Sequence, residues 1–485
     1  MSIQNLEPKV IWKNFYALTQ IPRPSKHEEK VIDYLYNWGV EHGFDTVKDD
    51  TGNIIIRVPA TPGMENRKGI ILQGHMDMVP QKTSDSAHDF LTDPIKAYVD
   101  GEWVTADHTT LGADNGIGVS MALAAIEDPS VQHGPLEVLV TYDEETGMTG
   151  ADKLRPGMLQ GDIFLNLDSE EEGELCVGCA GGLDAIATYK FHKNNMPAAY
   201  KGIVLDLKGL QGGHSGMDIS LYRANANKAM ARILLPLIEL FGAKVVRFDG
   251  GSLRNAIPFE ALAEIAVPEE DMEAAFKLIQ TTFEQIKNEY KESDPSMVLK
   301  VEEEPAAPKY IQGSVMLRAI KSIIAAPHGV VRMSRTMEGL TETSLNLAIV
   351  RTEGGKIIIH SLLRSSVDSA KADLAQQVRI VHELAGADKI EFIGGYPGWM
   401  PKLDTQANRL CMEQYEKVYG KPMKIMATHG GLECAILGAK YPNWEMVSIG
   451  PTIKYPHSPD EKVNIASVAR TWEYLKAILA NAPKK

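Results

Sequence analysis

The sequence is poor in positive charge and in cysteine, and it lacks long apolar runs. Asp and Glu outnumber Lys and Arg by 64 to 50, for a formal net charge of −14. Surfaces for nucleic acid or anionic membranes need a basic stripe, so this balance argues against both partners. No run of about 18 apolar residues occurs, which argues against a transmembrane helix. The first ten residues contain no apolar signal-peptide core, and we therefore expect a cytoplasmic protein that is not exported.

Only four cysteines occur in 485 residues. Cys176 and Cys179 form a C-x-x-C pair, but no second pair lies nearby, so the spacing does not indicate a zinc ribbon. We expect ordinary reduced cysteines instead. The remaining composition, 44% hydrophobic and 24% charged, is that of a globular protein with a sizeable core. The length is compatible with two large domains or with three of average size.

The stretch 69–80, GIILQGHMDMVP, is the feature around which we interpret the rest of the chain. Its short apolar run predicts a buried strand. Side chains two residues apart share a face of a strand, so His75 and Asp77 would emerge together near its end. A metal-ligating His usually donates its other ring N–H to a carboxylate or carbonyl, and Asp77 is placed for that role. By itself, such a pair is more often a surface His beside a chance Asp.

Carboxylates recur after further apolar strands, and this recurrence is the strongest signal in the sequence. The predicted strand 136–142 runs into Glu144 and Glu145, and a later apolar strand ends at Asp168. Because ligands bind at the carboxyl ends of strands in open α/β sheets, we expect these acids to face one site. Oxygen-rich sites with one or two imidazoles suit Zn, Mn or Co. A further imidazole, His457, is available in a Pro-bounded loop downstream.

Two other local patterns bear on the fold. The Gly-rich stretch 112–118 precedes an Ala-rich buried helix, but the G-x-G-x-x-G spacing of dinucleotide-binding proteins is absent. Asp114 stands at the start of that helix, where a lone carboxylate is more often an N-cap. Ser25 and Glu28 have capping-box spacing and predict a helix with its apolar face on Val31 and Leu35.

The motifs GHMDMVP, TTLGADNGIG, DEETGMTGA, NLDSEEEGE, GGHSG, RNAIP and PHSPDE occur in this order over essentially the whole chain. Together they resemble the aminoacyl-histidine (Xaa-His, carnosinase-like) dipeptidase family of the co-catalytic di-zinc metallopeptidases, to which carboxypeptidase G and aminoacylase are related. The resemblance implies an α/β fold with a zinc-peptidase-like mixed sheet flanked by helices and an inserted α+β lid domain. The acidic strand ends stop near Leu183, and we place the lid at 187–394, between catalytic segments 1–186 and 395–485.

The resemblance also implies roles for individual residues. His75, Asp114 and Asp168 would bind one divalent ion, and Asp114, Glu145 and His457 would bind a second. Glu144 would be the general base, and Asp77 would orient His75. The expected ions are two Zn²⁺, for which Mn²⁺ or Co²⁺ can substitute. Two such ions lower the pKa of a water and polarise the scissile carbonyl, while a neighbouring carboxylate takes the proton.

Three residues of the expected lid match positions that family members use on substrate. His214 and Asn255 would contact the substrate backbone or the oxyanion, and Arg364 would pair with the free carboxylate, for which a guanidinium fork is suited. Without the resemblance, His214 reads as a Gly-loop surface residue and Arg364 as a strand-edge charge. Glu433 either shapes the substrate-amine end or is structural, and residues 448–451 are expected to line the site through their backbone.

We therefore expect metal-dependent hydrolysis of unblocked dipeptides, preferentially Xaa-His and including β-alanyl-histidine. An aminoacylase or a tripeptidase on the same fold is an alternative, as is a non-catalytic metal-binding scaffold. A scaffold would be expected to lose Glu144 or a ligand, and all of them are present. The expected partners are a small dipeptide and a second copy of the chain, bound through the lid domain.

Overall fold

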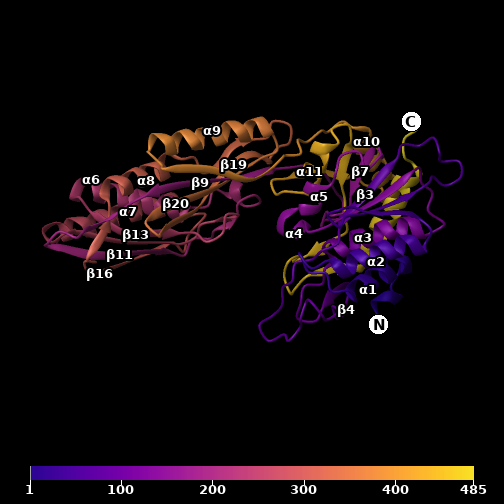
Figure 1. The fold of residues 1–485 in the computed structure, drawn as a ribbon, viewed down its shortest axis with the longest axis horizontal. Helices are drawn as coiled ribbons and strands as arrows, with labels where there is room; N and C mark the ends of the chain where they lie inside the picture. Colours follow the sequence, from indigo (N-terminus) through magenta and orange to yellow (C-terminus); the bar gives the residue numbers. More distant parts are fainter. Residues whose placement is uncertain (1) are drawn as a thin grey trace. The chain divides into compact units, whose positions relative to one another are not determined.

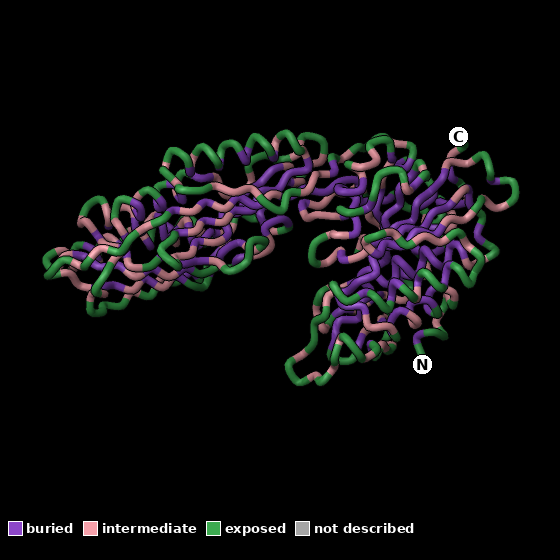
Figure 2. The backbone as a smooth tube through the Cα atoms, viewed as in Figure 1, coloured by how far each residue is buried: buried purple, intermediate pink, exposed green. Residues whose placement is uncertain are grey.

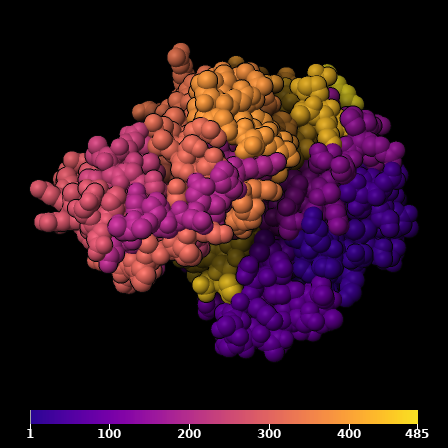
Figure 3. Space-filling model, turned by 60° about the vertical axis from the view of Figure 1, so that its left-hand side comes forward, coloured from indigo at the N-terminus to yellow at the C-terminus, as the bar shows by residue number. Residues whose placement is uncertain are grey.

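The computed structural model describes residues 2–485, and it divides the chain into two compact units (Figure 1). Unit 1 is discontinuous, and yellow C-terminal atoms lie beside the indigo and magenta atoms of the first part of the chain in Figure 3. Within 2–485, no helix is both long and apolar enough to cross a membrane. Unit 1 comprises the chain up to Gly178, Trp399–Ala427 and Leu432–Lys485, and unit 2 comprises Cys179–Gly398 and Thr428–Gly431.

Unit 1 is built on a mixed sheet. Its central strands β6, β3, β7 and β23 run parallel to one another. Strand β2 pairs antiparallel with β1 and β6, and β8 pairs antiparallel with β23. In spatial order, the eight strands of this sheet in the described residues are β1 (Asp45–Lys48), β2 (Ile54–Val58), β6 (Leu136–Thr141), β3 (Ile70–His75), β7 (Ile163–Asn166), β23 (Glu445–Ser448), β8 (Glu174–Cys179) and β22 (Lys424–Thr428).

Helices flank this sheet, and Figure 2 shows the strands at the centre of the unit as buried. Every residue of β3 and β6 is buried, as expected for near-continuous apolar runs in parallel strands covered on both faces. The helical segments of unit 1 are η1 (Ile3–Asn5), α1 (Lys9–Thr19), α2 (Glu29–Glu41), α3 (Ala113–Glu127), α4 (Glu144–Gly147), α5 (Thr149–Lys153), α10 (Gln406–Tyr419), α11 (Glu433–Lys440) and α12 (Ile465–Ala480).

The parallel pairing of β6, β3 and β7 aligns their carboxyl ends at one edge. His75 at the end of β3 pairs with Thr141 at the end of β6, and Gln73 pairs with Asn166 at the end of β7. The acidic segments that follow these strands therefore begin side by side, as the recurrence of acids after apolar strands predicted.

Helix α3 is buried along almost its whole length, which its Ala-rich sequence predicted. Its first turn lies against the segment that follows β7: Asn115 Nδ2 donates to the Leu167 carbonyl at 2.7 Å. A Cβ atom at Gly118 would lie 2.3 Å from that same carbonyl oxygen, so only glycine permits this approach. The Gly-rich stretch therefore serves helix packing and places Asp114 at the sheet edge.

A smaller four-stranded sheet completes unit 1 and carries the His457 loop. This loop lies between β24 and β25, which pair antiparallel, and β25 pairs in turn with β5. The four strands, in spatial order, are β24 (Ile453–Lys454), β25 (Lys462–Asn464), β5 (Trp103–Ala106) and β4 (Ala97–Asp100).

Unit 2 contains a nine-stranded sheet in the described residues, and eight of its strands form two groups of four. The groups meet where β13 pairs with β19 through Gly250 and Val350. In spatial order, the strands are β16 (Val298–Pro305), β11 (Tyr200–Lys208), β15 (Ala261–Pro268), β13 (Lys244–Gly250), β19 (Thr341–Glu353), β20 (Lys356–Ser365), β9 (Gly181–Lys190) and β21 (Lys389–Tyr396), with β18 (Gly329–Met333) pairing on β19.

Four long helices of unit 2 pack on this sheet and bury one apolar core, which includes Leu205, Ile279, Ile320 and Leu374. The outer turns of α9 are exposed in Figure 2. The remaining elements are η2 (Ile219–Leu221), α6 (Ala226–Phe241), η3 (Glu269–Asp271), α7 (Met272–Glu289), α8 (Gly313–Ala325), α9 (Asp368–Leu384), and the strand pairs β10 (Lys193–Asn195) with β17 (Lys309–Ile311) and β12 (Gly213–His214) with β14 (Ala256–Ile257).

The boundaries of unit 2 differ from the segment 187–394 drawn from the sequence. Both expected boundaries fall inside strands: position 187 lies in β9 and position 394 in β21. These strands pair with each other, and β9 also pairs with β20, so the whole of both strands belongs to unit 2. The short segment Thr428–Gly431 also belongs to unit 2, which no local pattern indicated.

Candidate active site

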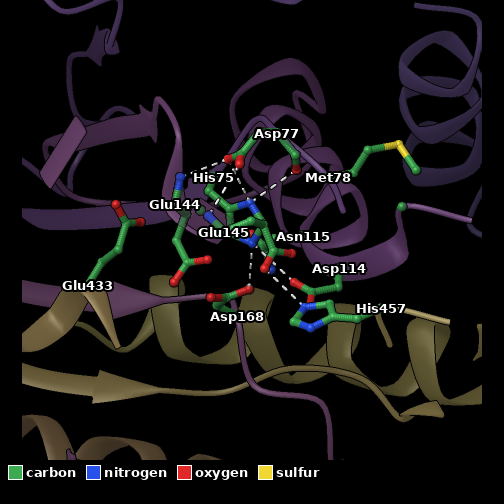
Figure 4. Close-up of polar contacts among 12 residues, drawn as sticks. His75, Asp77, Met78, Asp114, Asn115, Glu144, Glu145, Asp168, Glu433 and His457 are labelled. Carbon is green, nitrogen blue, oxygen red and sulfur yellow. Dashed lines mark hydrogen bonds and ion pairs between the residues drawn. The ribbon is translucent and has the colours of Figure 1, made fainter. Parts of the chain in front are cut away.

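Six titratable side chains from separate segments meet at the carboxyl edge of the unit 1 sheet (Figure 4). Five segments contribute them: the end of β3, the first turn of α3, the first turn of α4, the segment after β7 and the loop before β25. Together these segments bring in His75, Asp114, Glu144, Glu145, Asp168 and His457.

The two ring nitrogens of His75 face different carboxylates: Nε2 faces Asp114 and Asp168, and Nδ1 faces Asp77. Its Nε2 atom is 3.1 Å from Asp114 Oδ1 and 3.4 Å from Asp168 Oδ1. Its Nδ1 atom is 3.1 Å from the Asp77 carbonyl and 3.3 Å from Asp77 Oδ1. An Nδ1–H donated to Asp77 leaves the Nε2 lone pair facing Asp114 and Asp168, the arrangement of a ligating imidazole.

A second group of donors shares Asp114 with the first. His457 Nε2 is 3.1 Å from Asp114 Oδ2 and 3.0 Å from Glu145 Oε2. Asp114 thus directs Oδ1 toward His75 and Oδ2 toward His457. The two groups expected from the resemblance, His75 with Asp168 and Glu145 with His457, are both brought together around this one carboxylate.

The residues present fit divalent cations. Imidazole nitrogen and carboxylate oxygen are the donors that Zn, Mn and Co accept, and one ligand atom from each of His75, Asp114 and Glu145 lies within 4.8 Å of the others. Glu145 Oε1 is buried without a hydrogen-bond partner. An unsatisfied buried carboxylate oxygen is costly, and a cation at this position would satisfy it.

The electrostatics of the cluster point the same way. Burial raises the pKa of Asp168 to about 7, and it also raises the pKa of Glu145. The hydrogen bonds that Asp114 and Glu145 make with His457 raise the pKa of that imidazole to about 11. Burial opposes ionisation of Asp114, but hydrogen bonds to both imidazoles outweigh it and hold the pKa of Asp114 below its usual range. Positive charge is thus what this cluster of acids requires.

Asp77 links His75 to the Glu144–Glu145 turn. Its Oδ1 atom accepts from the Glu144 backbone N–H at 3.0 Å, and its Oδ2 atom accepts from the Glu145 N–H at 3.2 Å. The Ser25 hydroxyl donates to Oδ2 at 2.7 Å. The expectation that Ser25 caps α2 is therefore wrong: the helix starts at Glu29, and the hydroxyl serves Asp77 instead.

Glu144 stands apart from the two donor groups. Its backbone is fixed by Asp77, and Figure 4 shows its side chain directed toward the cluster. Burial raises the pKa of Glu144 well above its usual range, and the neighbouring acids Glu145 and Asp168 add to this effect. A carboxylate that sits beside the ligands and holds protons readily is suited to accept and return a proton.

Two buried residues that the sequence analysis missed hold the ligand-bearing loops. Glu461 accepts from the backbone N–H groups of Leu111 at 2.8 Å, Gly112 at 3.0 Å and Asp114 at 3.1 Å. The Arg23 guanidinium donates to the carbonyls of Met76 at 2.9 Å, Asp77 at 3.1 Å and Gly112. Glu461 follows His457 by four residues in the same motif, which was the only available signal; nothing marked Arg23.

Glu433 is one end of a network of buried hydrogen bonds among residues of β3, β6, β7 and β23. Its Oε2 atom accepts from Thr141 Oγ1 at 2.6 Å and from Gln73 Nε2 at 2.7 Å, while its Oε1 atom has no partner. Gln73 Oε1 accepts from Asn166 Nδ2 at 2.6 Å, and Ser448 donates to Asn166. Of the two roles considered for Glu433, this geometry supports the structural one. Ser448 contributes its side chain, whereas a backbone role was expected.

The expected substrate residues His214, Asn255 and Arg364 come together in unit 2. The Ser215 backbone N–H donates to the Asn255 carbonyl at 2.8 Å, and Arg364 Nε donates to the Ser215 hydroxyl at 3.2 Å. Arg364 is 5% exposed, yet it makes no ion pair with an acid among residues 2–485. The side chain of Asn255 lies in an exposed segment.

The His214 ring is oriented by its own loop. Its Nδ1 atom accepts from the N–H groups of Gly216 at 3.3 Å and Met217 at 3.1 Å, so Nε2 carries the proton in the neutral ring. Burial and the nearby Arg364 charge lower the pKa of His214. A neutral imidazole with a fixed N–H donor is suited to a substrate oxygen.

No cysteine belongs to a cluster of potential metal ligands in the described residues. Cys176 and Cys179 lie in β8, and all four cysteines are buried. Neither of the two clusters of potential metal ligands found in 2–485 contains a cysteine.

Comparisons with known proteins agree with this site. Residues 71–481 match the model of peptidase family M20/M25/M40. The cytosol non-specific dipeptidase of Escherichia coli K12 is 44% identical over 483 residues, which cover 100% of this chain and 99% of that protein. The crystal structure of aminoacylhistidine dipeptidase from Vibrio alginolyticus has a TM-score of 0.93 and 47% identity over 100% of this chain and 99% of that one.

A tripeptidase from Staphylococcus aureus shares the fold alone, with a TM-score of 0.56, 15% identity and 98% of each chain covered. The family match extends over most of the chain, and two full-length relatives exceed 40% identity. The chain therefore belongs to peptidase family M20/M25/M40.

Proposed function

We propose that this protein is a metallopeptidase that hydrolyses unblocked dipeptides, preferentially Xaa-His and including β-alanyl-histidine. The observation that carries the proposal is the sharing of Asp114 between two donor groups, with Glu144 beside both. The names of the two full-length relatives, a non-specific dipeptidase and an aminoacylhistidine dipeptidase, support the dipeptide and His-containing substrate.

His75, Asp114 and Asp168 would hold one divalent ion, and Asp114, Glu145 and His457 the other. We propose Zn²⁺ at both positions, with Mn²⁺ or Co²⁺ as substitutes, because the donors are imidazole and carboxylate. When bound, such ions polarise the scissile carbonyl and lower the pKa of the attacking water. Asp77 fixes the tautomer of His75, so that its Nε2 lone pair is available for an ion.

The proton is handled by Glu144. We propose that its carboxylate takes a proton from the attacking water as the C–O bond forms, and then delivers it to the leaving amine as the C–N bond breaks. Because Asp77 accepts from the backbone of both Glu144 and Glu145, the base and the neighbouring ligand are held in one turn.

We propose that Arg364 binds the C-terminal carboxylate of the substrate, and that His214 and Asn255 contact its backbone. The support is physical: a buried guanidinium without an acidic partner costs free energy, and an anionic ligand would offset that cost. Both hydrogen bonds of Arg364 go to neutral hydroxyl oxygens, so its charge remains available.

We also propose a cytoplasmic homodimer. The word cytosol in the name of the Escherichia coli relative supports the location. For the dimer, unit 2 offers exposed apolar side chains at Leu221, Tyr222, Leu253 and Phe259. Light scattering coupled to gel filtration measures the mass directly, and a monomer at micromolar concentration would contradict the dimer.

A substrate panel tests the proposed activity. Chelator-stripped protein is assayed before and after addition of Zn²⁺, Mn²⁺ or Co²⁺, on β-Ala-His, Ala-His, Ala-Ala, a tripeptide and an N-acetyl amino acid, while calorimetry counts bound ions. We expect two ions per chain and metal-restored cleavage of the unblocked dipeptides, strongest with His second. Preferred cleavage of the tripeptide or N-acetyl compound would overturn the substrate, and no cleavage with two ions bound would indicate a metal-binding scaffold.

A further inference from the structure

Tyr396, at the end of β21, is one of two hydroxyl-bearing residues that hold Arg364. Its hydroxyl oxygen accepts a hydrogen bond from Arg364 Nη1 at 3.4 Å, and the Ser215 hydroxyl accepts from Nε at 3.2 Å. Both partners are neutral. They can orient the guanidinium without cancelling its charge, which an aspartate or glutamate in either place would do.

Two glycines leave the space that the Tyr396 ring occupies. Gly182 on β9 pairs directly with Tyr396, and a Cβ atom at position 182 would lie 2.6 Å from the ring atom Cε1. On the segment Thr428–Gly431, a Cβ atom at Gly431 would lie 2.8 Å from the hydroxyl oxygen and 3.0 Å from Cε2. Real Cβ contacts are longer than this, so neither position accepts a side chain while the ring keeps its place.

The Tyr396 hydroxyl can still donate a hydrogen bond after it has accepted one from Arg364. A phenol that accepts one hydrogen bond still carries its own O–H donor. Burial raises the pKa of Tyr396, so the group stays a neutral donor at physiological pH. The guanidinium beside it has no acidic partner in the described chain. An O–H and a charged N–H that lie together are complementary to one carboxylate.

We propose that Tyr396 is a further substrate-binding residue, whose O–H donates to the C-terminal carboxylate of the dipeptide while its oxygen keeps Arg364 in position. The inference rests on the carboxylate role proposed for Arg364. Tyr396 then contributes to the selection of free C-termini over blocked ones, and Gly182 and Gly431 are small because the ring must fit between them.

Tyr396→Phe is the direct test, because it removes only the hydroxyl. For a free dipeptide such as Ala-His, we expect KM to rise about tenfold with little change in kcat, since a hydrogen bond to a charged group is lost. For the C-terminal amide of the same dipeptide, kcat/KM should change less than about twofold. The midpoint of thermal unfolding, measured in parallel, reports any structural damage.

A matched pair of glycine variants tests the same idea with the tyrosine intact. Gly431→Ala places a methyl group against the hydroxyl, whereas Gly430→Ala meets only the Thr428 hydroxyl, at 3.4 Å. Neither glycine has a positive φ, so alanine fits the backbone at both positions. Gly431→Ala should raise KM for the free dipeptide several-fold and spare the amide, while Gly430→Ala should behave as the wild type.

Equal losses on the free dipeptide and its amide in Tyr396→Phe would make the residue structural and overturn the inference, as would no loss on either. Arg364→Ala separates this failure from that of the proposed function. If Arg364→Ala discriminates free dipeptide from amide but Tyr396→Phe does not, only the inference fails. If Arg364→Ala does not discriminate, the carboxylate role fails, and the role of Tyr396 fails with it.

Discussion

The two units bury charges of opposite sign. In unit 1, carboxylates from separate segments converge around Asp114, and the His75 and His457 imidazoles and the Arg23 guanidinium lie close to them. In unit 2, the buried Arg364 guanidinium donates to two hydroxyls, and it makes no ion pair with an acid among residues 2–485. Buried charge is costly unless it is paired. In the proposed function, a ligand of the opposite sign completes the charge of each unit: cations in unit 1 and a carboxylate in unit 2.

The contrast extends to the supports of the two sites. Charged groups hold the loops of unit 1: Glu461 binds the backbone before α3, and Arg23 binds the carbonyls after β3. Around Arg364 the supports are neutral, namely Ser215 and Tyr396. An acidic side chain next to Arg364 would pair with the guanidinium and leave no positive charge for a ligand. In unit 1, the acids at the site outnumber the positively charged side chains beside them.

Glu144→Gln should have the largest effect, because it removes the proposed proton carrier from unit 1 without removing a metal ligand. We expect kcat to fall by at least about 10²-fold, with two ions still bound. Turnover on Ala-His and metal content by mass spectrometry are the measurements. Glu171→Gln is the control, since that exposed carboxylate pairs only with Lys454 at the surface. Loss of an ion, or turnover near that of the wild type, would remove the assignment of Glu144 as the base.

Arg364→Ala should break the positive site of unit 2 and leave unit 1 intact. Charge-assisted hydrogen bonds contribute about 1.5–3 kcal/mol each, so kcat/KM for free dipeptides should fall roughly 10- to 100-fold. The C-terminal amides, which carry no charge there, should lose less than about threefold. Arg335→Ala, at an exposed position of the same unit, should change neither substrate. Equal losses on acid and amide would contradict a carboxylate role.

Glu461→Gln and Glu433→Gln compare two buried glutamates of unit 1 that use their carboxylate oxygens differently. Glu461 uses both carboxylate oxygens, on three backbone N–H groups, whereas Glu433 uses only Oε2. An amide can replace the idle oxygen of Glu433 but not either oxygen of Glu461. In Glu461→Gln we expect the metal affinity to fall about tenfold, the loss typical when a group supporting a ligand is altered, and in Glu433→Gln to stay within about threefold.

Calorimetric titration with Zn²⁺ and thermal unfolding of the metal-free protein measure both quantities for this pair. A similar loss of affinity in both variants would show that metal affinity depends on the buried negative charge and not on the hydrogen bonds of the carboxylate. A lower unfolding temperature in Glu461→Gln without any change in affinity would reduce Glu461 to a purely structural role.

Much of unit 1 was predictable because its signals are local. Apolar strands that end in acids can be read residue by residue, and parallel pairing of β6, β3 and β7 brings those ends together. The supports were not predictable, because they act across the chain: Glu461 and the loop before α3 are 347 to 350 residues apart. Ser25 shows the same limit, since its spacing to Glu28 predicted a helix cap while its hydroxyl bonds to Asp77.

The limits of unit 2 were harder to place for a related reason. A boundary is visible in sequence only where composition changes, but β9 joins unit 2 through pairing with β20 and β21, far along the chain. Neutral partners such as Tyr396 carry no sequence signal at all, because an isolated tyrosine at a strand end is ordinary.

The smallest expected effect concerns the response of unit 2 to acid. His382 in α9 is buried, with Nδ1 2.9 Å from the Tyr189 hydroxyl, and burial lowers the pKa of His382 to about 4. Unfolded, the imidazole would titrate near pH 6.5. Between about pH 6.5 and 4, the unfolded chain therefore binds a proton that the folded chain does not, so stability falls as pH falls through this window and levels off below it.

Full loss of that term amounts to roughly 3 kcal/mol, since one pKa unit corresponds to about 1.4 kcal/mol. Burial lowers the pKa of His328 and His429 in the same unit to about 3, so several imidazoles share the window. His382→Gln should flatten the dependence of urea-unfolding stability on pH by close to one proton between pH 7 and 4.5, whereas exposed His192→Gln should leave the slope unchanged. Equal slopes in all three proteins would mean that His382 does not contribute to the acid response of unit 2, and this prediction would be wrong.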